Sequence, residues 1–474
     1  MVFSSSLFLL YFLPTFLLLY YLTPYRFKNL IIVLASILFY SWGGPQYILI
    51  IFFSIFLDFT IAKHIFKATG NKRRILLILG LTINLGFLAY FKYANFFLEN
   101  VNILFTDLGL KGFSFFKIAL PIGISFFTFH EISYIVDVYR NDKKPMTNII
   151  DYGLYILFFP QLIAGPIIRY NEIADQIKDR RNFENIDNKL IGFFRFCIGL
   201  AKKVLIANVL GAEADKIFAI EPAILSTSEV WIGVMAYAFQ IYFDFSGYSD
   251  MAIGIARMLG FVFPENFNNP YTSGSITEFW RRWHMTLSRW MRDYLYIPLG
   301  GSKVKTKRRL YFNLWIVFVF SGFWHGAAWN FLAWGVFHGF FLAAERLFLN
   351  KFYKIIGKYP SILFTFIITL IGWVLFRSET LSNAIEYIRK MFSFVFNFNI
   401  VKFNNEFWII FIVAAFFSFI RLSSFGKYLE DKIYSDNYSM RRIFAMSFLS
   451  IIIYFLAICS VTSLGFNPFI YFRF

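Results

Sequence analysis

The chain is poor in charged residues for its length. Only 16% of its 474 residues are Asp, Glu, Lys or Arg, whereas a soluble domain averages about 25%. Hydrophobic residues make up 58%, with 67 Phe among them, and the mean hydropathy is +0.59. The apolar runs have helical length and lack the alternation of an outer-membrane barrel strand. This composition excludes an ordinary soluble protein and predicts an all-α polytopic membrane protein.

Cysteine is scarce, and several catalytic signatures are missing. The two cysteines, Cys197 and Cys459, both lie in apolar runs and give neither a disulfide framework nor CxxC metal spacing. There is no P-loop, no GxGxxG after a strand and no HExxH motif. A serine triad built on Ser246 or Ser288 has no GxSxG elbow to support it. The sequence therefore supports neither ATP hydrolysis nor a bound metal.

The charge that is present is strongly positive, with a formal net charge of +18. In a soluble protein this would suggest nucleic acid. Here Lys and Arg cluster in short loops between apolar runs, as the positive-inside rule predicts, so no nucleic-acid partner is expected. By this rule the basic loops after the first apolar run, at 303–309 and before the last run face the cytoplasm. Both termini are then expected on the outer side.

The apolar runs predict roughly 10–12 crossings of about 20 residues each, with re-entrant and interfacial amphipathic helices around a central funnel. The first run, near Phe3–Leu22, has no basic n-region, so we interpret it as a retained span rather than a signal peptide. Val230–Phe245 and Tyr248–Phe263 are predicted as two separate spans. We expect a single membrane domain over 1–474, with 465–474 as a short outer tail.

Residues 276–297, called the Arg/Trp segment below, do not form a lipid-facing span. Arginines and tryptophans alternate along the segment, which predicts one amphipathic helix at the bilayer boundary. His284 lies within it, in the sequence Trp283-His-Met285. We interpret His284 as a second acid/base or a substrate-orienting group. The alternative is an interfacial histidine satisfied by a backbone carbonyl.

His325 lies in an unusual setting for an ionisable residue. It follows Leu310 by about 15 residues, or roughly 22 Å of continuous helix, which places it at membrane depth. Burying such a group there is costly unless it is paired or useful, and imidazole is suited to moving a proton near neutral pH. Small neighbours and a wall of Trp324, Trp329 and Trp334 predict a general base in a water-poor cavity. A packing histidine between helices is the alternative.

Other polar residues are assigned structural roles. Asp244 and Asp250 lie between two apolar runs, and intramembrane carboxylates commonly pair with arginine. We expect them to pair with arginines of the Arg/Trp segment. His64, His130 and His338 are interpreted as packing or loop-end residues.

The end of the chain, Phe469-Ile-Tyr-Phe-Arg-Phe474, carries one phenol among other aromatic residues. One interpretation is an aromatic belt that anchors a helix end. The other is a tail that folds back into a cavity, where Tyr471 would act as a nucleophile. A phenol with a pKa of about 10 would need a base for this.

Several segments together resemble the membrane-bound O-acyltransferase family. Within it, the chain resembles the branch of membrane subunits of bacterial alginate and peptidoglycan O-acetyltransferases. Ile297-Pro-Leu-Gly-Gly301 favours this branch over the related teichoic-acid D-alanylation subunit. The segments that carry the resemblance are Phe158–Pro166, Asp244–Gly254, Pro264–Phe267, Glu278–Ser288, Arg292–Gly301 and Phe323–Gly326.

The resemblance implies roles for individual residues. His325 matches the family's catalytic histidine, and His284 matches a second, more branch-specific histidine. His130 stands where similar sequences are expected to have Gln, which argues against a required role for it. Related envelope systems carry an acylated tyrosine in a C-terminal Phe-x-Tyr-Phe motif. Phe469–Phe472 matches this motif, so Tyr471 is expected to be an acyl acceptor.

The function implied is transfer of an acetyl group from cytoplasmic acetyl-CoA across the bacterial inner membrane to a cell-envelope glycan. An extracytoplasmic serine esterase-like O-acetyltransferase is the expected partner. Peptidoglycan is favoured as the polymer and an alginate-like exopolysaccharide is second, and the residues do not decide between them. The rivals are a transporter of an acyl donor or lipid with a histidine proton relay, and a lipid-acylating enzyme of the same fold. No metal is expected, and the residues that bind CoA are not predicted.

Overall fold

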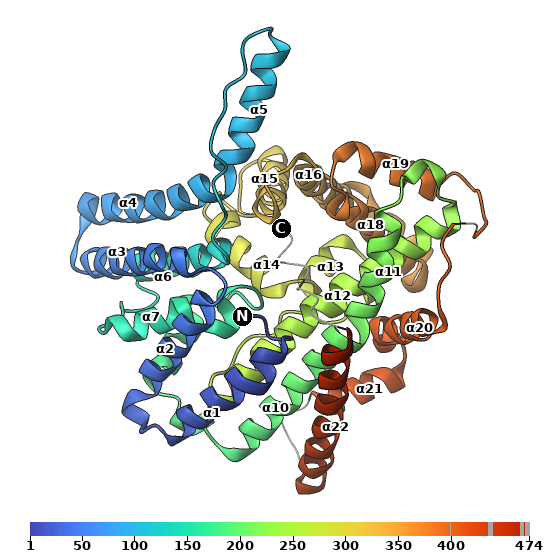
Figure 1. The fold of residues 1–474 in the computed structure, drawn as a ribbon. Helices are drawn as coiled ribbons and strands as arrows, with labels where there is room; N and C mark the ends of the chain where they lie inside the picture. The colour runs from blue at the N-terminus through green and yellow to red at the C-terminus, as the bar shows by residue number, and fades with distance from the viewer. Residues whose placement is uncertain (399, 435–438, 465–468, 470–474) are drawn as a thin grey trace. The chain divides into compact units, whose positions relative to one another are not determined.

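The computed structural model describes residues 1–398, 400–434, 439–464 and 469. Over that part of the chain it consists of helices and connecting loops, without a β-strand (Figure 1). The all-helical polytopic prediction is therefore confirmed. Six helices in this part are long and apolar enough to cross a membrane, namely Pro45–Lys67, Gly70–Asp107, Trp329–Ile356, Lys358–Arg377, Asn405–Leu422 and Met440–Ser463. The larger number of crossings stays a prediction.

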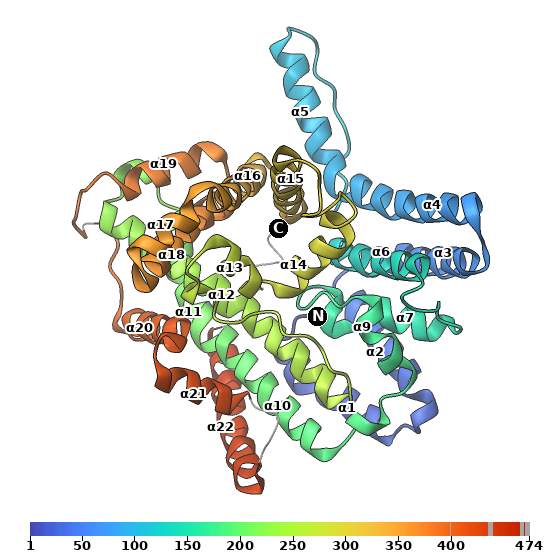
Figure 2. The same ribbon diagram turned by 180° about the vertical axis from the view of Figure 1, so that it is seen from behind.

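The chain divides into two compact units, of which the first comprises residues 1–188 and 259–263. In this unit α3, α4 and α6 lie side by side (Figures 1 and 2). Gly80 of α4 allows their close approach, since a Cβ there would lie 2.7 Å from the Ile135 side chain of α6. The helices of the unit are α1 (Leu13–Leu22), α2 (Lys28–Ser41), α3 (Ile48–Lys67), α4 (Gly70–Leu88), α5 (Ala94–Asp107), α6 (Ile124–Arg140), α7 (Ile149–Leu157), α8 (Phe159–Leu162) and α9 (Tyr170–Lys178).

The second unit comprises residues 189–258 and 264–474 and contains both candidate histidines. Two short π-helical segments matter below, η6 (Lys202–Ala207) and η10 (Glu345–Leu349). The α-helices are α10 (Ile186–Ala201, which begins in the first unit), α11 (Asn208–Phe218), α12 (Thr227–Met258), α13 (Ile276–Arg282), α14 (Met285–Met291), α15 (Lys307–His325), α16 (Trp329–Ala344), α17 (Asn350–Ile356), α18 (Lys358–Arg377), α19 (Leu381–Met391), α20 (Asn405–Phe419), α21 (Ser424–Ile433) and α22 (Met440–Leu464).

Helix α12 is continuous over 32 residues, so the prediction of two spans at 230–245 and 248–263 is wrong. The polar stretch between them looked like a connection. Its carboxylates are instead paired inside the unit, and Gly247 serves helix packing rather than a turn. Polar side chains that find hydrogen-bonding or ion-pair partners on neighbouring helices can stay buried within a continuous helix.

Two pairs of glycines set the contact between α10 and α12. A Cβ on Gly254 would lie 2.5 Å from the carbonyl oxygen of Gly192, and a Cβ on Gly199 would lie 2.5 Å from that of Gly247. Backbones approach this closely only where neither residue has a side chain, as is common between membrane helices. The glycines therefore fix the position of α12 against α10.

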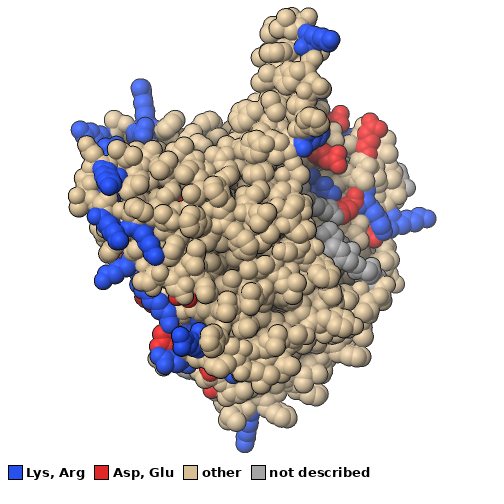
Figure 3. Space-filling model, turned by 60° about the vertical axis from the view of Figure 1, so that its left-hand side comes forward, with Lys and Arg blue, Asp and Glu red and all other residues tan. Residues whose placement is uncertain are grey.

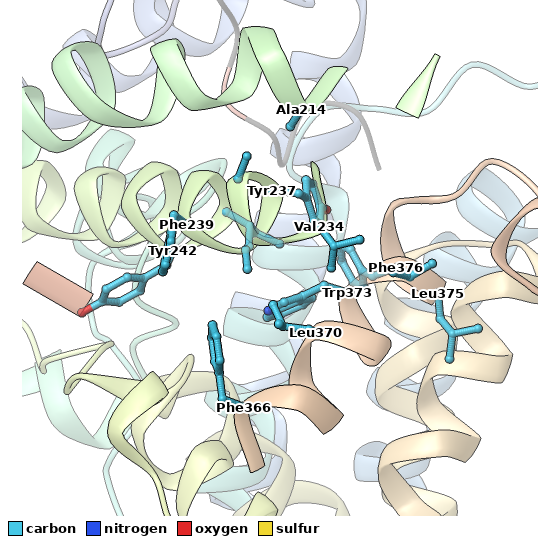
Figure 4. Close-up of a cluster of buried hydrophobic side chains, with 14 of the residues drawn as sticks. Ala214, Val234, Tyr237, Phe239, Tyr242, Phe366, Leu370, Trp373, Leu375 and Phe376 are labelled. Carbon is cyan, nitrogen blue, oxygen red and sulfur yellow. The ribbon is translucent and has the colours of Figure 1, made fainter. Parts of the chain in front are cut away.

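An aromatic core holds α12 against α18 in the second unit. Figure 4 shows Trp373 and Phe376 of α18 beside Val234 and Tyr237 of α12, and all four side chains are buried. Burying large apolar side chains contributes about 25 cal/mol per Å². This core carries Phe376 to the candidate site described below.

Much of the exposed surface is apolar. On the face shown in Figure 3, residues that are neither basic nor acidic cover a broad area, and Lys and Arg gather mainly at its edges. Large hydrophobic residues of the candidate spans are exposed, among them Leu363, Phe416 and Phe455. Such a surface suits lipid rather than water. The protein is a multi-pass membrane protein.

The glycine contacts predict a selective loss of stability on substitution. Gly254→Ala would place its methyl group against the backbone of Gly192 and Phe196, and this overpacking should lower the free energy of unfolding by about 1–3 kcal/mol. Thermal unfolding in detergent, followed by the amount of monodisperse protein that remains, measures the change. Gly86→Ala is the matched control, since a Cβ there meets nothing within 4 Å. Equal melting temperatures for the two variants would contradict the packing argument.

Candidate active site

His325 is the last residue of α15, at the tip of a helical hairpin. The helix runs unbroken from Lys307, which confirms the predicted continuous segment, and α16 returns beside it (Figures 1 and 2). Glycines allow the close approach, because a Cβ on Gly322 would lie 2.3 Å from the carbonyl oxygen of Phe331. A Cβ on Gly326 would lie 2.2 Å from the Phe331 ring. The hairpin therefore holds His325 firmly in place.

Aromatic rings surround the His325 imidazole. Its ring centroid lies 4.8 Å from that of Trp324, 5.2 Å from Trp334 and 5.3 Å from Phe376. Only 7% of the residue is exposed. Two of the three tryptophans expected to form a wall, Trp324 and Trp334, do so, and Trp329 is 58% exposed. The surroundings are those of a water-poor site.

His284 lies at a break between two helices, so the prediction of one continuous helix over the Arg/Trp segment is wrong. Helix α13 ends at Arg282, α14 begins at Met285, and His284 adopts left-handed angles of φ 44° and ψ 53°. A non-glycine residue rarely adopts them. The cause is tertiary, because the Met285 amide donates to the carbonyl oxygen of Asn266 at 2.9 Å. A strained residue held this way is a common mark of a functional site.

Asn266 also holds the imidazole of His284. Its Nδ2 donates to Ser249 Oγ at 3.0 Å, and its Oδ1 accepts from Thr286 Oγ1 at 2.8 Å. The same Oδ1 lies 3.1 Å from His284 Nδ1. Since Oδ1 can only accept, Nδ1 carries the proton of the neutral ring and Nε2 carries the lone pair. The partner is thus a side-chain amide rather than the backbone carbonyl considered from the sequence.

His284 is neutral in this position. The residue is 1% exposed, and burial lowers the pKa of its imidazole to about 3, because the charged form loses its hydration. Its surroundings overlap those of the other histidine, since the His284 ring centroid lies 6.5 Å from that of Trp324. The structure therefore brings both candidate histidines to one aromatic cluster around Trp324.

The buried carboxylates of α12 are paired, but not with the expected partners. Asp244 forms an ion pair with Lys203 at 2.5 Å, and Asp250 pairs with Arg195 at 2.6 Å and with Lys202 at 2.7 Å. The prediction that arginines of the Arg/Trp segment would neutralise them is wrong. Helices α10 and η6 lie along α12 at the glycine contacts, so their basic side chains reach the carboxylates first. The carboxylates support the fold of the site.

A cavity of about 200 Å³ is lined by residues of α13, α14, α15 and α16 and of the π-helical segments η9 (Arg292–Tyr296) and η10. Its lining includes Ser321, one helical turn before His325, together with mostly apolar side chains. Three guanidinium groups also line it, those of Arg281, Arg292 and Arg346. Sequence reasoning did not find this cavity, because residues of the Arg/Trp segment meet residues of α15, α16 and η10 that are far away along the chain.

Tyr471 lies outside the residues that the structure describes, but Phe469 lies within them. Phe469 is 1% exposed. Its ring centroid lies 4.9 Å from that of Tyr248, and Lys203 Nζ lies 4.6 Å from its centre. The chain two residues before Tyr471 is therefore packed on α12 in the second unit. The sequence offered Phe469 only as part of a motif and did not indicate this contact.

The remaining histidines have ordinary surroundings or lie elsewhere. Trp280 Nε1 donates to His338 Nδ1 at 3.4 Å, as suits a packing residue. His130 is buried on α6 in the first unit. Within the described ranges, no group of three or more His, Cys, Asp or Glu side chains is placed to hold a metal ion.

Two buried histidines beside an arginine-lined cavity, in a multi-pass helical protein, fit a membrane enzyme of group transfer. Comparison with known proteins makes the class specific. Residues 87–385 match the family described as MBOAT, membrane-bound O-acyltransferase family. The chain belongs to this family and is an O-acyltransferase.

Individual relatives cover most of the chain. The chain is 46% identical over 398 residues to the probable alginate O-acetylase AlgI of Pseudomonas aeruginosa, across 83% of this chain and 75% of that protein. It is 39% identical over 426 residues to the peptidoglycan O-acetyltransferase of Helicobacter pylori, across 82% and 80%. A teichoic acid D-alanyltransferase of Bacillus subtilis is 30% identical over 245 residues, across 49% and 61%. The resemblance to the O-acetyltransferase branch is confirmed.

The hydrogen bond from His284 to Asn266 predicts a catalytic defect. Asn266→Ala removes the acceptor that fixes the ring and its tautomer, and the rate of acyl transfer should fall about 10–100-fold, by analogy with the groups that orient metal-bound histidines. Asn266→Asp keeps an acceptor for Nδ1 and should retain more activity. Initial rates with purified protein measure this, and Asn383→Ala at an exposed position is the control. Full activity in Asn266→Ala would contradict the assigned role.

Proposed function

We propose that the protein transfers acetyl groups from cytoplasmic acetyl-CoA across the bacterial inner membrane for O-acetylation of a cell-envelope glycan. The observation that carries the proposal is the position of His325, at the buried end of α15 and one turn beyond a cavity that contains three arginines. The similarity to two kinds of bacterial O-acetyltransferase supports it.

In the proposed reaction His325 acts as the general base. It takes the proton of the acceptor hydroxyl while the oxygen attacks the thioester carbonyl. The carbon–sulfur bond then breaks, and the imidazolium returns the proton to the departing thiolate. The aromatic rings around His325 exclude water, which limits hydrolysis of the thioester.

His284 has a supporting role in this scheme. With its proton held on Nδ1 by Asn266, its Nε2 acts as a hydrogen-bond acceptor. A neutral, fixed acceptor orients a hydroxyl group or a water molecule without adding charge to a buried site.

The cavity suits the acyl-bearing arm of the donor. Pockets that enclose a whole drug-sized ligand span about 300–1,000 Å³, whereas this cavity is about 200 Å³. It would therefore hold the pantetheine arm and the acetyl group but not the adenosine. The three arginines would offer charge-assisted hydrogen bonds to the pyrophosphate at the end of this arm, and the positive-inside rule favours a cytoplasmic position for this side.

The acceptor proposed is Tyr471, which would relay the acetyl group. The support is Phe469, which is buried against Tyr248 and Lys203. Tyr471 follows Phe469 by only two positions in the sequence. The phenol would lose its proton to His325 and form an acetyl ester.

An extracytoplasmic serine esterase-like partner would then move the acetyl group to the glycan. Peptidoglycan is the favoured polymer, and the second candidate is an alginate-like exopolysaccharide. The second is supported by the alginate O-acetylase relative, which has the higher identity of the two, 46% against 39%.

The proposal predicts acetyl transfer from labelled acetyl-CoA to the chain itself. Purified wild-type protein should become labelled on Tyr471, and His325→Ala should lose the label because the phenol keeps its proton. Tyr471→Phe should also lose it, and Phe469→Ala should lower it several-fold because the tail is no longer anchored. Radiolabelled donor and peptide mapping by mass spectrometry measure these outcomes.

The outcomes separate the rival functions. Neither label nor thioester cleavage in wild type would refute acetyl transfer from acetyl-CoA. Label that persists in Tyr471→Phe would refute only the relay. Passage of intact donor across proteoliposomes without thioester cleavage would favour a transporter, and activity only with long-chain thioesters would favour a lipid-acylating enzyme.

A further inference from the structure

A second and larger cavity, of about 790 Å³, lies in the second unit and is called the basic pocket below. Helix α13 separates it from the smaller cavity near Ser321, which is the proposed donor cavity. Thr277 and Arg281 line the donor cavity, whereas Glu278 and Arg282 line the basic pocket. The proposed reaction makes no use of it. Its charged lining residues are Glu278, Arg282, Lys354, Lys358, Arg421 and Lys427.

The basic pocket has an excess of positive charge. Five cations and one carboxylate line it. Both arginines are already neutralised, Arg282 by Glu278 at 2.5 Å and Arg421 by Glu430 and Asp431, each at 3.3 Å. The pocket has three lysines, Lys354, Lys358 and Lys427. None of them forms an ion pair with a residue in the described part of the chain. Three ammonium groups around one hollow attract a polyvalent anion.

The basic pocket lies where membrane spans end. The candidate span 329–356 ends at it, the span 358–377 begins at it, and the span 405–422 ends at it. Since α16 and α15 form a hairpin, the end of the span 329–356, at α17, shares a side of the membrane with the basic loop at 303–309. The basic pocket is therefore at the cytoplasmic surface predicted by the positive-inside rule.

Exposed apolar residues alternate with the pocket lysines along the chain. Ile355 is 82% exposed, Tyr359 63% and Leu363 60%, and they flank Lys354 and Lys358. A soluble anion would gain nothing from these side chains. A lipid would lay its acyl chains on them while its headgroup meets the lysines.

We propose that the basic pocket binds the headgroup of an anionic phospholipid from the cytoplasmic leaflet. Basic pockets between transmembrane helices on this side of a membrane commonly bind such headgroups. The bound lipid joins the ends of α17, α18 and α21, which otherwise carry mutually repelling lysines. The proposal is independent of the acceptor and of the relay through Tyr471.

Lipid retention by the full-length protein tests the proposal. Protein in nanodiscs of phosphatidylglycerol and phosphatidylcholine is released for native mass spectrometry, and the lipids that remain bound are counted. Wild type should retain more phosphatidylglycerol than phosphatidylcholine. In the triple variant Lys354→Gln, Lys358→Gln, Lys427→Gln, the ratio of bound phosphatidylglycerol to bound phosphatidylcholine should fall about tenfold, because each lysine near the membrane surface attracts anionic lipid. Phosphatidylglycerol should also raise the melting temperature of wild type and not that of the triple variant.

Matched variants make the test specific. Replacing Lys305, Lys351 and Lys432 by Gln removes the same charge outside the basic pocket and should leave retention unchanged. Changing the three pocket lysines to Arg should keep it, because the positive charge is retained. Equal retention of the two lipids by wild type, or equal effects of the two Gln variants, would overturn the proposal.

One further arm distinguishes the donor from the lipid as occupant. Displacement of phosphatidylglycerol by CoA, with a rise in the KM for acetyl-CoA in the pocket Gln variant, would assign the basic pocket to the donor nucleotide and overturn the proposal. An unchanged KM together with lost lipid retention supports it.

Discussion

The hydrogen bond between His284 Nδ1 and Asn266 Oδ1 is the contact on which the geometry of the site depends. It is buried, it fixes the tautomer of the ring, and it accompanies a backbone contact from Met285 to the same asparagine. Together these contacts compensate for the left-handed backbone of His284, which on its own costs about 1–3 kcal/mol. Asn266 itself is held by Ser249 of α12. The position of His284 therefore depends on the position of α12.

Close backbone contacts give the site its rigidity. Glycine pairs fix α12 against α10, and Gly322 and Gly326 allow the tip of the α15–α16 hairpin to close around Phe331. Packing of this kind substitutes for the hydrophobic effect, which drives helices together only weakly within lipid. Ion pairs at Asp244 and Asp250 then let a polar stretch remain inside one long helix. A water-poor site for acyl transfer needs such a frame, because small displacements of reacting groups are costly.

Local patterns in the sequence were enough to predict the helical membrane class and the family. Each of these depends on residues that are close along the chain, such as an apolar run or a short motif. Three features could not be predicted because they depend on residues far apart. The break at His284 comes from Asn266, although the arginine and tryptophan spacing of that segment is typical of one helix. The partners of Asp250 come from α10 and η6, and the cavity near Ser321 is lined by six helical elements.

In the proposed reaction the acetyl donor meets His325 through the cavity lined by Ser321 and the three arginines. The most direct test is a structure of the full-length protein with a non-hydrolysable acetyl-CoA analogue. We expect the arm of the analogue to occupy this cavity, with its carbonyl carbon within about 3–3.5 Å of the site where the acceptor oxygen meets His325. An analogue bound with its carbonyl away from His325, and with the cavity at Ser321 left empty, would contradict it.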